Sequence, residues 1–354
     1  MKNMFNIKTP SNIYMWWNLG SNIMFMMMIQ ISTGLILSTN YMVSTNPFNS
    51  SINIFMNLNY GWLMRLTHSN LTSMIFIIIL CHMTRSIMFN SFYIYKMWYT
   101  GMMLIIFLMA ESFIGYSLIW NQMSYWAMMV ITNFISTIPN LGKKMIKLLW
   151  GNFNINIILI NRFFTIHFLV PALIMLTSLT HLIILHNNKS NNPMGLNNKI
   201  DLIKLNPLFI IKDLIIVLMI LNMLMNIILL KPFLFSNSDN FIMMNYFKTP
   251  NHIEPEWYFM FFYSILRTIN NKLSGLMILM LSFSMLIIMP MINKKKFQSF
   301  NPINKILMIN LIMFILMISM MSKKNVEFPF KELNSLLIYL YFVNFALMNY
   351  MKKF

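Results

Sequence analysis

The sequence predicts an all-α polytopic membrane protein with eight transmembrane helices. Hydrophobic residues make up 58% of the 354 residues and charged residues only 10%, far less charge than a water-soluble domain carries. Uninterrupted apolar runs of about 20 residues, the length needed to cross the hydrocarbon layer, recur along the whole chain. Composition and run length together therefore place the chain in a lipid bilayer.

Eight segments carry this pattern. An even number of spans puts both chain ends on one face of the membrane, which would also hold most of the lysine clusters, although lysines in the opposite loops make that bias modest. The stretch Met123–Ile138, which ends before Pro139, is shorter and amphipathic, and we expect it along the membrane surface. In chain order the expected spans are Ser21–Asn40, Trp62–Phe89, Met97–Trp120, Asn161–His186, Leu208–Leu230, Leu273–Ile292, Ile306–Met321 and Leu336–Tyr350.

The net charge of +18 restricts the partners. The lysines lie in loops and tails between apolar spans and form no basic face, so they favour anionic lipid headgroups over nucleic acid. The chain is also rich in residues with A/T-rich codons, including 41 Met and 31 Phe. Such a bias is typical of a small genome, so we expect an organelle-encoded protein.

Four of the six histidines form two pairs with the same spacing of fourteen residues. They are His68 and His82, then His167 and His181. Fourteen residues is close to four helical turns, so the members of a pair lie on one helix face, roughly 21 Å apart. Two such helices can bind two flat, metal-centred cofactors between imidazoles. A single histidine is more often hydrogen-bonded inside a bundle, but the repeated spacing favours bis-histidine haem, bound twice.

The order of the spans predicts which histidines face each other. The second and fourth spans run parallel, which pairs His68 with His167 and His82 with His181, the first pair lying toward the face opposite the chain ends. The first and third spans hold glycines at the same interval: Gly20, Gly34, Gly101 and Gly115. Glycine lets a ring edge approach the backbone closely; helix packing through small residues is the alternative. We therefore expect the first four spans to form a bundle around two stacked haems.

Arginine and cysteine usage agrees with haem binding. Only four of the 26 basic side chains are Arg. Arg65 and Arg85 each lie three residues from a predicted ligand, where a guanidinium suits a propionate carboxylate. Arg162 precedes His167 by five residues and could equally reach the membrane surface. The single Cys81 excludes an internal disulfide, and without a Cys-x-x-Cys-His motif any haem would be bound non-covalently.

Besides the histidines, five short motifs stand out in the sequence. They are Trp16-Trp17-Asn18-Leu19-Gly20, Gly115-Tyr116, Gln122-Met123-Ser124, Ser190-Asn191-Asn192-Pro193 and Pro255-Glu256-Trp257-Tyr258. With these motifs the chain resembles the cytochrome b family in its mitochondrial form, the haem-carrying subunits of ubiquinol–cytochrome c oxidoreductase (respiratory complex III). The resemblance begins at Ser11 and continues to the last span, and eight spans in one chain with equal histidine spacings favour this respiratory form over the split photosynthetic one.

The resemblance implies two quinone sites. The motif around Glu256 lies in the loop between spans five and six, on the face opposite the chain ends and beside the His68–His167 haem. A carboxylate among aromatic rings could accept a proton from a quinol; a loop acid in a salt bridge is the alternative. Tyr258, Tyr263 and Tyr116 are expected to line this pocket.

The second quinone site is expected on the other face, near the His82–His181 haem. His186 and Ser190 close span four, and Lys212 and Asp213 open span five. An imidazole and a carboxylate could deliver the two protons that quinone reduction takes up, and ionisable residues at membrane depth are by default functional. Asp213 could instead be an interfacial residue. Another intramembrane carboxylate, Glu111 in span three, receives no role from the sequence.

The implied function is electron transfer from ubiquinol through two b-type haems to quinone, coupled to proton translocation. Iron–sulfur and c-type centres need cysteines that this chain lacks, so an iron–sulfur protein and a c-type cytochrome are the implied partners, in a dimeric complex of the mitochondrial inner membrane. Residues 1–207 would form the di-haem unit, and residues 208–354 would carry the quinol-oxidation loop and the remaining spans.

Four positions depart from the usual family pattern. Ile119 and Asn121 stand where Pro and Gly are usual, and Ala127 and Thr84 each replace a usual Gly. These changes bear on the shape of the oxidation pocket and its sensitivity to inhibitors, and leave haem ligation intact. A transporter with proton-relaying histidines and a structural subunit without quinone turnover remain alternatives, although the inverted repeat typical of transporters is not visible.

Overall fold

The computed structural model describes residues 8–44, 46–188, 201–250, 252–292 and 302–351. A helix occupies every one of the eight predicted spans. The first six are long and apolar enough to cross a membrane, whereas α11 counts as a shorter apolar helix over Lys305–Met321 and α12 carries Lys331 and Glu332 in its first turn. The helices are α1 Leu19–Ser38, α3 Gly61–Met88, α4 Tyr95–Ser117, α7 Ile157–Asn188, α8 Leu208–Leu230, α10 Lys272–Ile292, α11 Pro302–Met321 and α12 Phe330–Met351.

Shorter helices connect these spans. The predicted surface stretch is α5 (Gln122–Ile135), while α2 (Pro47–Asn57), α6 (Gly142–Trp150) and α9 (Met260–Thr268) were not predicted. In α2, Asn46 caps the first turn by accepting hydrogen bonds from the backbone N–H groups of Phe48 and Asn49. Four 3₁₀ turns among the described residues complete the connections: η2 Met15–Trp17, η3 Ser91–Tyr93, η4 Ser238–Phe241 and η5 Trp257–Phe259.

One small sheet departs from the all-helical prediction. Strand β1 (Lys8–Pro10) pairs antiparallel with β2 (Leu202–Lys204), and Thr9 lies opposite Ile203. Strands of three residues have too little sequence for a period-two pattern to identify them. The sheet joins the segment before α1 to the segment before α8.

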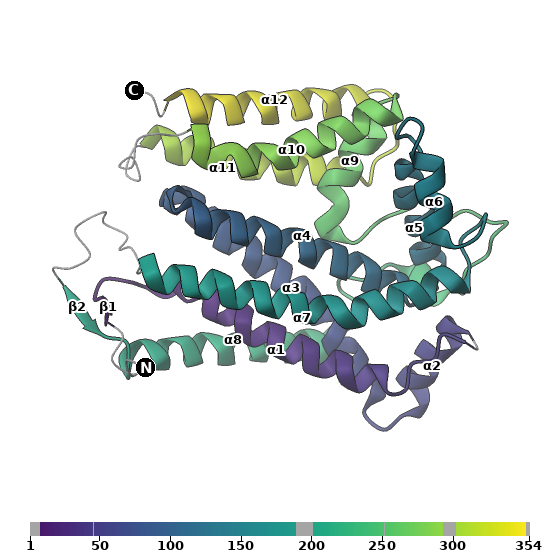
Figure 1. Ribbon diagram of the computed structural model, residues 1–354, viewed down its shortest axis with the longest axis horizontal. Coiled ribbons are helices and arrows are strands. Elements are labelled where there is room, and N and C mark those ends of the chain that lie inside the picture. The colour runs from purple at the N-terminus through teal and green to yellow at the C-terminus, as the bar shows by residue number, and fades with distance from the viewer. Residues whose placement is uncertain (1–7, 45, 189–200, 251, 293–301, 352–354) are drawn as a thin grey trace.

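The helices pack in layers (Figure 1). Helices α9 to α12 form one layer; α1, α3, α4 and α7 form the next, with α1 against α3 and α4 against α7; and α8 packs on α3 and α1. The sheet and the C-terminal end of α12 lie at one end of the bundle, and α5 and α6 lie at the other. This arrangement agrees with the prediction that an even number of spans places the two ends of the chain on the same side.

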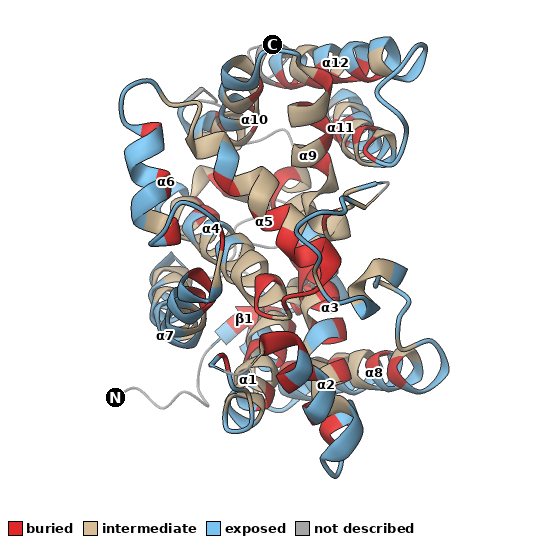
Figure 2. Ribbon diagram, turned by 90° about the vertical axis from the view of Figure 1, so that its right-hand side faces the viewer, coloured by how far each residue is buried: buried red, intermediate tan, exposed pale blue. Residues whose placement is uncertain are grey.

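The core runs through the middle of the bundle. Figure 2 shows buried residues along α3 and α5, whereas the outward sides of α7 and α8 are exposed. Many exposed side chains of α7 are large and apolar, among them Phe168, Leu169 and Leu176. An apolar outer surface is what a helix in contact with lipid requires, so the exposed sides of α7 support a membrane location.

Candidate functional site

The four paired histidines lie where the spacing predicted. His68 and His82 are on α3, and His167 and His181 are on the parallel helix α7. The ring centroids of His68 and His167 are 6.3 Å apart, with the ring planes 85° to each other. His82 and His181 are close enough to interact electrostatically. The pairing predicted from the order of the spans is therefore confirmed.

The four glycines of α1 and α4 each lie against one of these imidazoles. A Cβ atom built on Gly115 would be 2.6 Å from Cε1 of His167, and one on Gly34 would be 3.0 Å from Cε1 of His68. For Gly101 the distance to Cε1 of His181 is 3.4 Å, and for Gly20 the distance to Cε1 of His82 is 3.5 Å. The sequence assigned these glycines to a haem edge; in the structure the atoms nearest to their built Cβ positions belong to the four histidine rings.

Each imidazole also has a partner at its Nδ1 atom. Thr33 Oγ1 lies 3.1 Å from Nδ1 of His68, and Thr100 Oγ1 lies 2.8 Å from Nδ1 of His181. Both hydroxyls donate their own proton to backbone carbonyls, so they accept from Nδ1–H and leave Nε2 free. Sequence reasoning missed both threonines, although the dipeptide Thr-Gly at Gly34 and Gly101 was a visible signal.

The other two partners are charged. Glu111 Oε1 lies 2.7 Å from Nδ1 of His167, and Arg85 Nη2 lies 3.3 Å from Nδ1 of His82. A guanidinium can only donate, so the Arg85 contact places the ring proton of His82 on Nε2. Ligation through Nε2 of His82 would require that contact to break. Buried Nε of Arg85 has no hydrogen-bond partner among the described residues, which leaves it available to a carboxylate.

These donors fit haem. A metal–imidazole bond is about 2 Å long and the nitrogen lies about 1 Å from the ring centre, so two imidazoles on one metal have centroids roughly 6 Å apart. The observed 6.3 Å between His68 and His167 matches this spacing. Within the described part of the chain, no three His, Cys, Asp or Glu residues gather to hold a metal ion. Two axial imidazoles therefore suit a metal whose other ligands come from a macrocycle.

A second cluster of site residues surrounds Glu256 in the segment between α8 and α9. Burial raises the pKa of the Glu256 carboxyl to about 7. The following residues are anchored to α3: the Tyr258 ring stacks on Phe76 with centroids 4.1 Å apart, and Trp257 Nε1 donates to Ser73 Oγ at 3.2 Å. The segment thus holds a half-buried carboxyl against aromatic rings.

Two of the three predicted tyrosines lie at this cluster. Burial and then the charge of Glu256 raise the pKa of Tyr258, and Tyr116 also interacts with Glu256 while its hydroxyl donates to Asn240 Oδ1 at 2.8 Å. Tyr263 is placed differently, because Arg267 lies over its ring, 5.4 Å from the centroid. Sequence reasoning missed Phe76, which lies on α3, and Asn240, which lies in η4 earlier in the same connection between α8 and α9.

The residues predicted for the second quinone site are less closely gathered. The Asp213 carboxyl on α8 interacts with the Ser21 hydroxyl on α1, and Lys212 Nζ lies 5.2 Å from the ring centroid of Phe209. His186 is exposed near the end of α7. Ser190 lies outside the described residues. The structure shows no contact between His186 and Asp213 in the described part of the chain.

Two arginines bind the backbone of surface helices. Arg65 Nη1 donates to the Ser51 carbonyl of α2 at 3.0 Å and lies over Phe55. Arg162 Nη1 donates to the carbonyls of Leu148 and Leu149 at the end of α6. A cation there satisfies helix carbonyls that lack an intrahelical partner, so Arg162 has a structural role and Arg65 fixes α2 to α3.

The departures from the family pattern also receive structural reasons. Asn121 is fully buried and caps α5: its side chain accepts from Ser124 N–H, and Ser124 Oγ accepts in return from Asn121 N–H. Asn121 Nδ2 also donates to Asn240 at 3.2 Å. Thr84 Oγ1 donates to the Cys81 carbonyl within α3. Ala127 is buried, and nothing in the structure explains Ile119.

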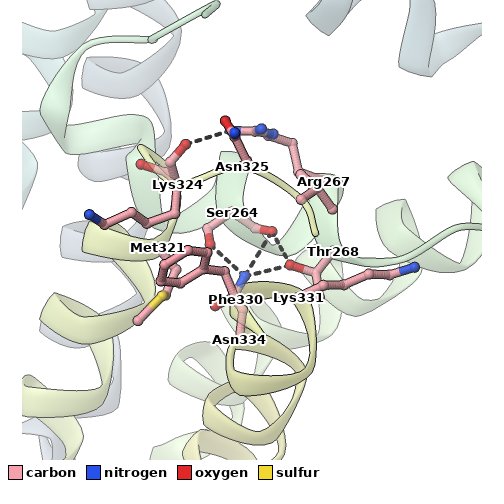
Figure 3. Close-up of a pocket in the computed structure, with 11 residues that line it drawn as sticks. Ser264, Arg267, Thr268, Met321, Lys324, Asn325, Phe330, Lys331 and Asn334 are labelled. Atoms are coloured by element: carbon pink, nitrogen blue, oxygen red, sulfur yellow. Dashed lines mark hydrogen bonds between the residues drawn. The ribbon is translucent and has the colours of Figure 1, made fainter. Parts of the chain in front are cut away.

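A separate polar cluster joins α9 to α12 (Figure 3). Buried Asn334 of α12 donates to Ser264 Oγ at 2.8 Å and to Thr268 Oγ1. Nearby, Arg267 Nη1 donates to the Ser322 carbonyl at 2.6 Å. These bonds hold α9, the helix that follows Glu256, against α12 and the end of α11. The cluster therefore helps to fix the position of the Glu256 segment.

The chain matches two family models and is similar to solved structures. The family model described as cytochrome b/b6/petB matches residues 4–189, and the model described as cytochrome b(C-terminal)/b6/petD matches residues 243–342. A solved chain titled "Hyperthermophilic respiratory Complex III" is similar with a TM-score of 0.91 at 22% identity, covering 98% of this chain and 93% of that one. This structural likeness shows the fold.

Proposed function

Because this chain belongs to the cytochrome b family, we propose that it is the membrane subunit of a quinol–cytochrome c oxidoreductase that moves electrons from ubiquinol to quinone across the membrane. The observation that carries this proposal is the facing of His68 and His167, with ring centroids 6.3 Å apart, together with a second pair, His82 and His181, that lies close enough to interact electrostatically about four helical turns away.

Four histidines would hold two b-type haems, one between His68 and His167 and the other between His82 and His181. Bound there, the two haems supply one-electron carriers at two depths of the membrane. Thr33, Thr100 and Glu111 orient their imidazoles through Nδ1, and glycines leave room for the rings. Arg85, with its buried unpaired Nε, would bind a propionate carboxylate.

Glu256 acts in quinol oxidation. Conversion of ubiquinol to ubiquinone releases two electrons and two protons. With a pKa of about 7, the Glu256 carboxylate is able to accept a proton from a quinol hydroxyl near neutral pH. Tyr258 and Tyr116 would line the pocket beside it. One electron leaves to an iron–sulfur protein and then a c-type cytochrome; the other crosses to the opposite face.

His186, Ser190, Lys212 and Asp213 act at the opposite face. Reduction of quinone there takes up two electrons, delivered by two turnovers of the first site, and two protons. His186 and Asp213 would supply those protons, while Ser190 and Lys212 help to bind the quinone. Release of protons on one face and uptake on the other couples electron transfer to a proton gradient.

The setting of the reaction is a multi-subunit assembly. The likeness to a chain from a respiratory Complex III supports iron–sulfur and c-type cytochrome subunits as partners in a dimeric complex. Composition supports an organelle-encoded subunit of the mitochondrial inner membrane, surrounded by lipid.

The test is a dithionite-reduced minus oxidised optical spectrum of the purified complex, with haem quantified per chain. We expect two b-type haems, with one lost from His68→Ala and the other lost from His82→Ala. The matched control is His252→Ala, because His252 is an exposed loop histidine and its loss should leave both haems in place. A wild-type complex with no haem, or with one, would overturn the proposal in favour of a transporter.

A further inference from the structure

Glu111 is a buried carboxylate that the quinone chemistry does not use. It lies on α4 at the depth of His167, four residues before Gly115. Its side chain is 12% exposed, and Oε1 is 2.7 Å from Nδ1 of His167. Among the described residues, neither buried Oε2 nor Nδ1 of His167 makes a hydrogen bond of good geometry, so the contact between the two groups rests on their 2.7 Å separation. The carboxyl therefore contacts one side chain, the imidazole of His167, which is a predicted haem ligand.

A carboxylate at this depth needs a strong reason to be there. Transfer of an unpaired charge into the membrane interior is costly. In the described part of the chain, Glu254 pairs with Lys323, whereas Glu111 contacts no lysine or arginine and lies only against the imidazole of His167. The cost of burying the Glu111 carboxylate is explained if its negative charge acts on the haem that His167 is proposed to bind.

The Nδ1 partners of the four histidines form an asymmetric set. At each predicted haem site, one ligand contacts a neutral threonine: Thr33 at His68 and Thr100 at His181. The second ligand contacts a charged group, which is Glu111 at His167 and Arg85 at His82. An anion thus lies beside one site, whereas at the other site the Arg85 contact would have to break before Nε2 of His82 could bind a metal.

Charge beside an axial ligand changes a haem in a known direction. A carboxylate that accepts from Nδ1–H fixes the ring with Nε2 toward the metal and raises the basicity of the imidazole. A more basic ligand and a nearby negative charge both stabilise the ferric state over the ferrous state, which lowers the reduction potential.

We propose that Glu111 is a positioning residue that orients His167 and lowers the reduction potential of the haem held between His68 and His167. The inference rests on the haem sites of the proposed function. Glu111 affects only this haem site because its carboxylate reaches only His167. Thr33, a neutral acceptor, orients the His68 ring without adding charge.

The test is a spectroelectrochemical titration of the two b-type haems in the intact complex carrying Glu111→Gln. Glutamine has the shape of glutamate and an oxygen that accepts from Nδ1–H, but no charge. We expect both haems to remain, the midpoint potential of one to shift to a more positive value, and the other to stay unchanged. Thr177→Ala is the matched control, because Thr177 is a half-buried α7 hydroxyl whose hydrogen bonds stay within its own helix, and neither potential should shift.

Other outcomes overturn the inference. Unchanged potentials in Glu111→Gln, a negative shift, or equal shifts of both haems would show that the charge does not act on this site. If Glu111→Gln loses one haem, Glu111→Asp separates charge from volume: retention of two haems supports the need for a carboxylate, and loss from both variants contradicts it. A wild-type complex without two haems would instead refute the proposed function.

Discussion

The phenol ring of Tyr258 lies flat on the phenyl ring of Phe76, with centroids 4.1 Å apart and planes 9° from parallel. The preceding residue, Trp257, donates to Ser73 on the same face of α3. Since residues three apart on a helix are neighbours, the two contacts form one attachment point. The segment that holds Glu256 is thereby fixed to the helix that carries His68.

Removal of the Phe76 ring should loosen that attachment. An aromatic pair contributes about 0.5–1.5 kcal/mol beyond the area it buries, so we expect Phe76→Ala to lower kcat/KM for quinol oxidation by up to about tenfold while both haems are retained. Steady-state quinol oxidation, normalised to haem content, measures this. Phe168→Ala on the exposed side of α7 is the control, and equal activity in the two variants would contradict the role of the contact.

The pH dependence of quinol oxidation should follow Glu256. Burial raises the pKa of its carboxyl to about 7, so the carboxylate that accepts protons predominates above that pH and is lost as the pH falls below it. The rate should therefore decline on the acid side of about pH 7. Glu256→Gln should lower the rate by about 100-fold or more and flatten this acid limb.

Glu254→Gln is the matched control for that profile. Glu254 lies two residues away, accepts from Asn237 Nδ2 at 3.3 Å and pairs with Lys323. Its substitution should leave the acid limb in place. A limb that persists in Glu256→Gln, or disappears in Glu254→Gln, would assign the proton transfer to another group.

Alanine substitution of the four glycines should have graded effects on haem content. A Cβ at Gly115 would be 2.6 Å from Cε1 of His167, whereas one at Gly20 would make an ordinary contact at 3.5 Å from Cε1 of His82. We expect Gly115→Ala to lose the haem near His167 and Gly20→Ala to keep both. Haem per chain measures the series, and a reversed order would show that the imidazole contacts do not set the tolerance.

The polar cluster behind the Glu256 segment should contribute to stability. Asn334→Ala removes the donor to Ser264 Oγ and Thr268 Oγ1 inside the protein, which costs about 1–3 kcal/mol when buried partners are left unsatisfied. Thermal unfolding of the detergent-solubilised complex should show a lower Tm for this variant. Asn222→Ala on the exposed side of α8 should have no measurable effect; equal Tm values for both variants would argue against the cluster.

The fourteen-residue intervals could be interpreted from sequence alone because helix geometry is periodic. Apolar runs located all eight long helices, and parity paired His68 with His167. Ends were less well predicted: α12 begins at Phe330, ahead of the predicted Leu336, and α7 begins at Ile157, ahead of Asn161. Polar residues can continue a helix past the edge of an apolar run, so a hydropathy pattern does not mark its last turn.

Contacts between distant segments could not be predicted from the sequence. The connecting helices α2, α6 and α9 are too short to be stable alone and depend on packing. Tyr263 follows the Glu256 motif closely, and the structure adds a contact that the sequence did not predict, with the Arg267 guanidinium over its ring one turn further along α9.

The amino-acid sequence by itself determined the membrane setting, the long helices and the four predicted ligands, since these depend on local hydropathy and helical period. Only the tertiary structure decided what surrounds those ligands: the glycine backbone against each ring, threonine at two Nδ1 atoms, Arg85 at a third and Glu111 at the fourth. The reason is physical. These neighbours come from other turns and other helices, and their distances are set by how the helices pack.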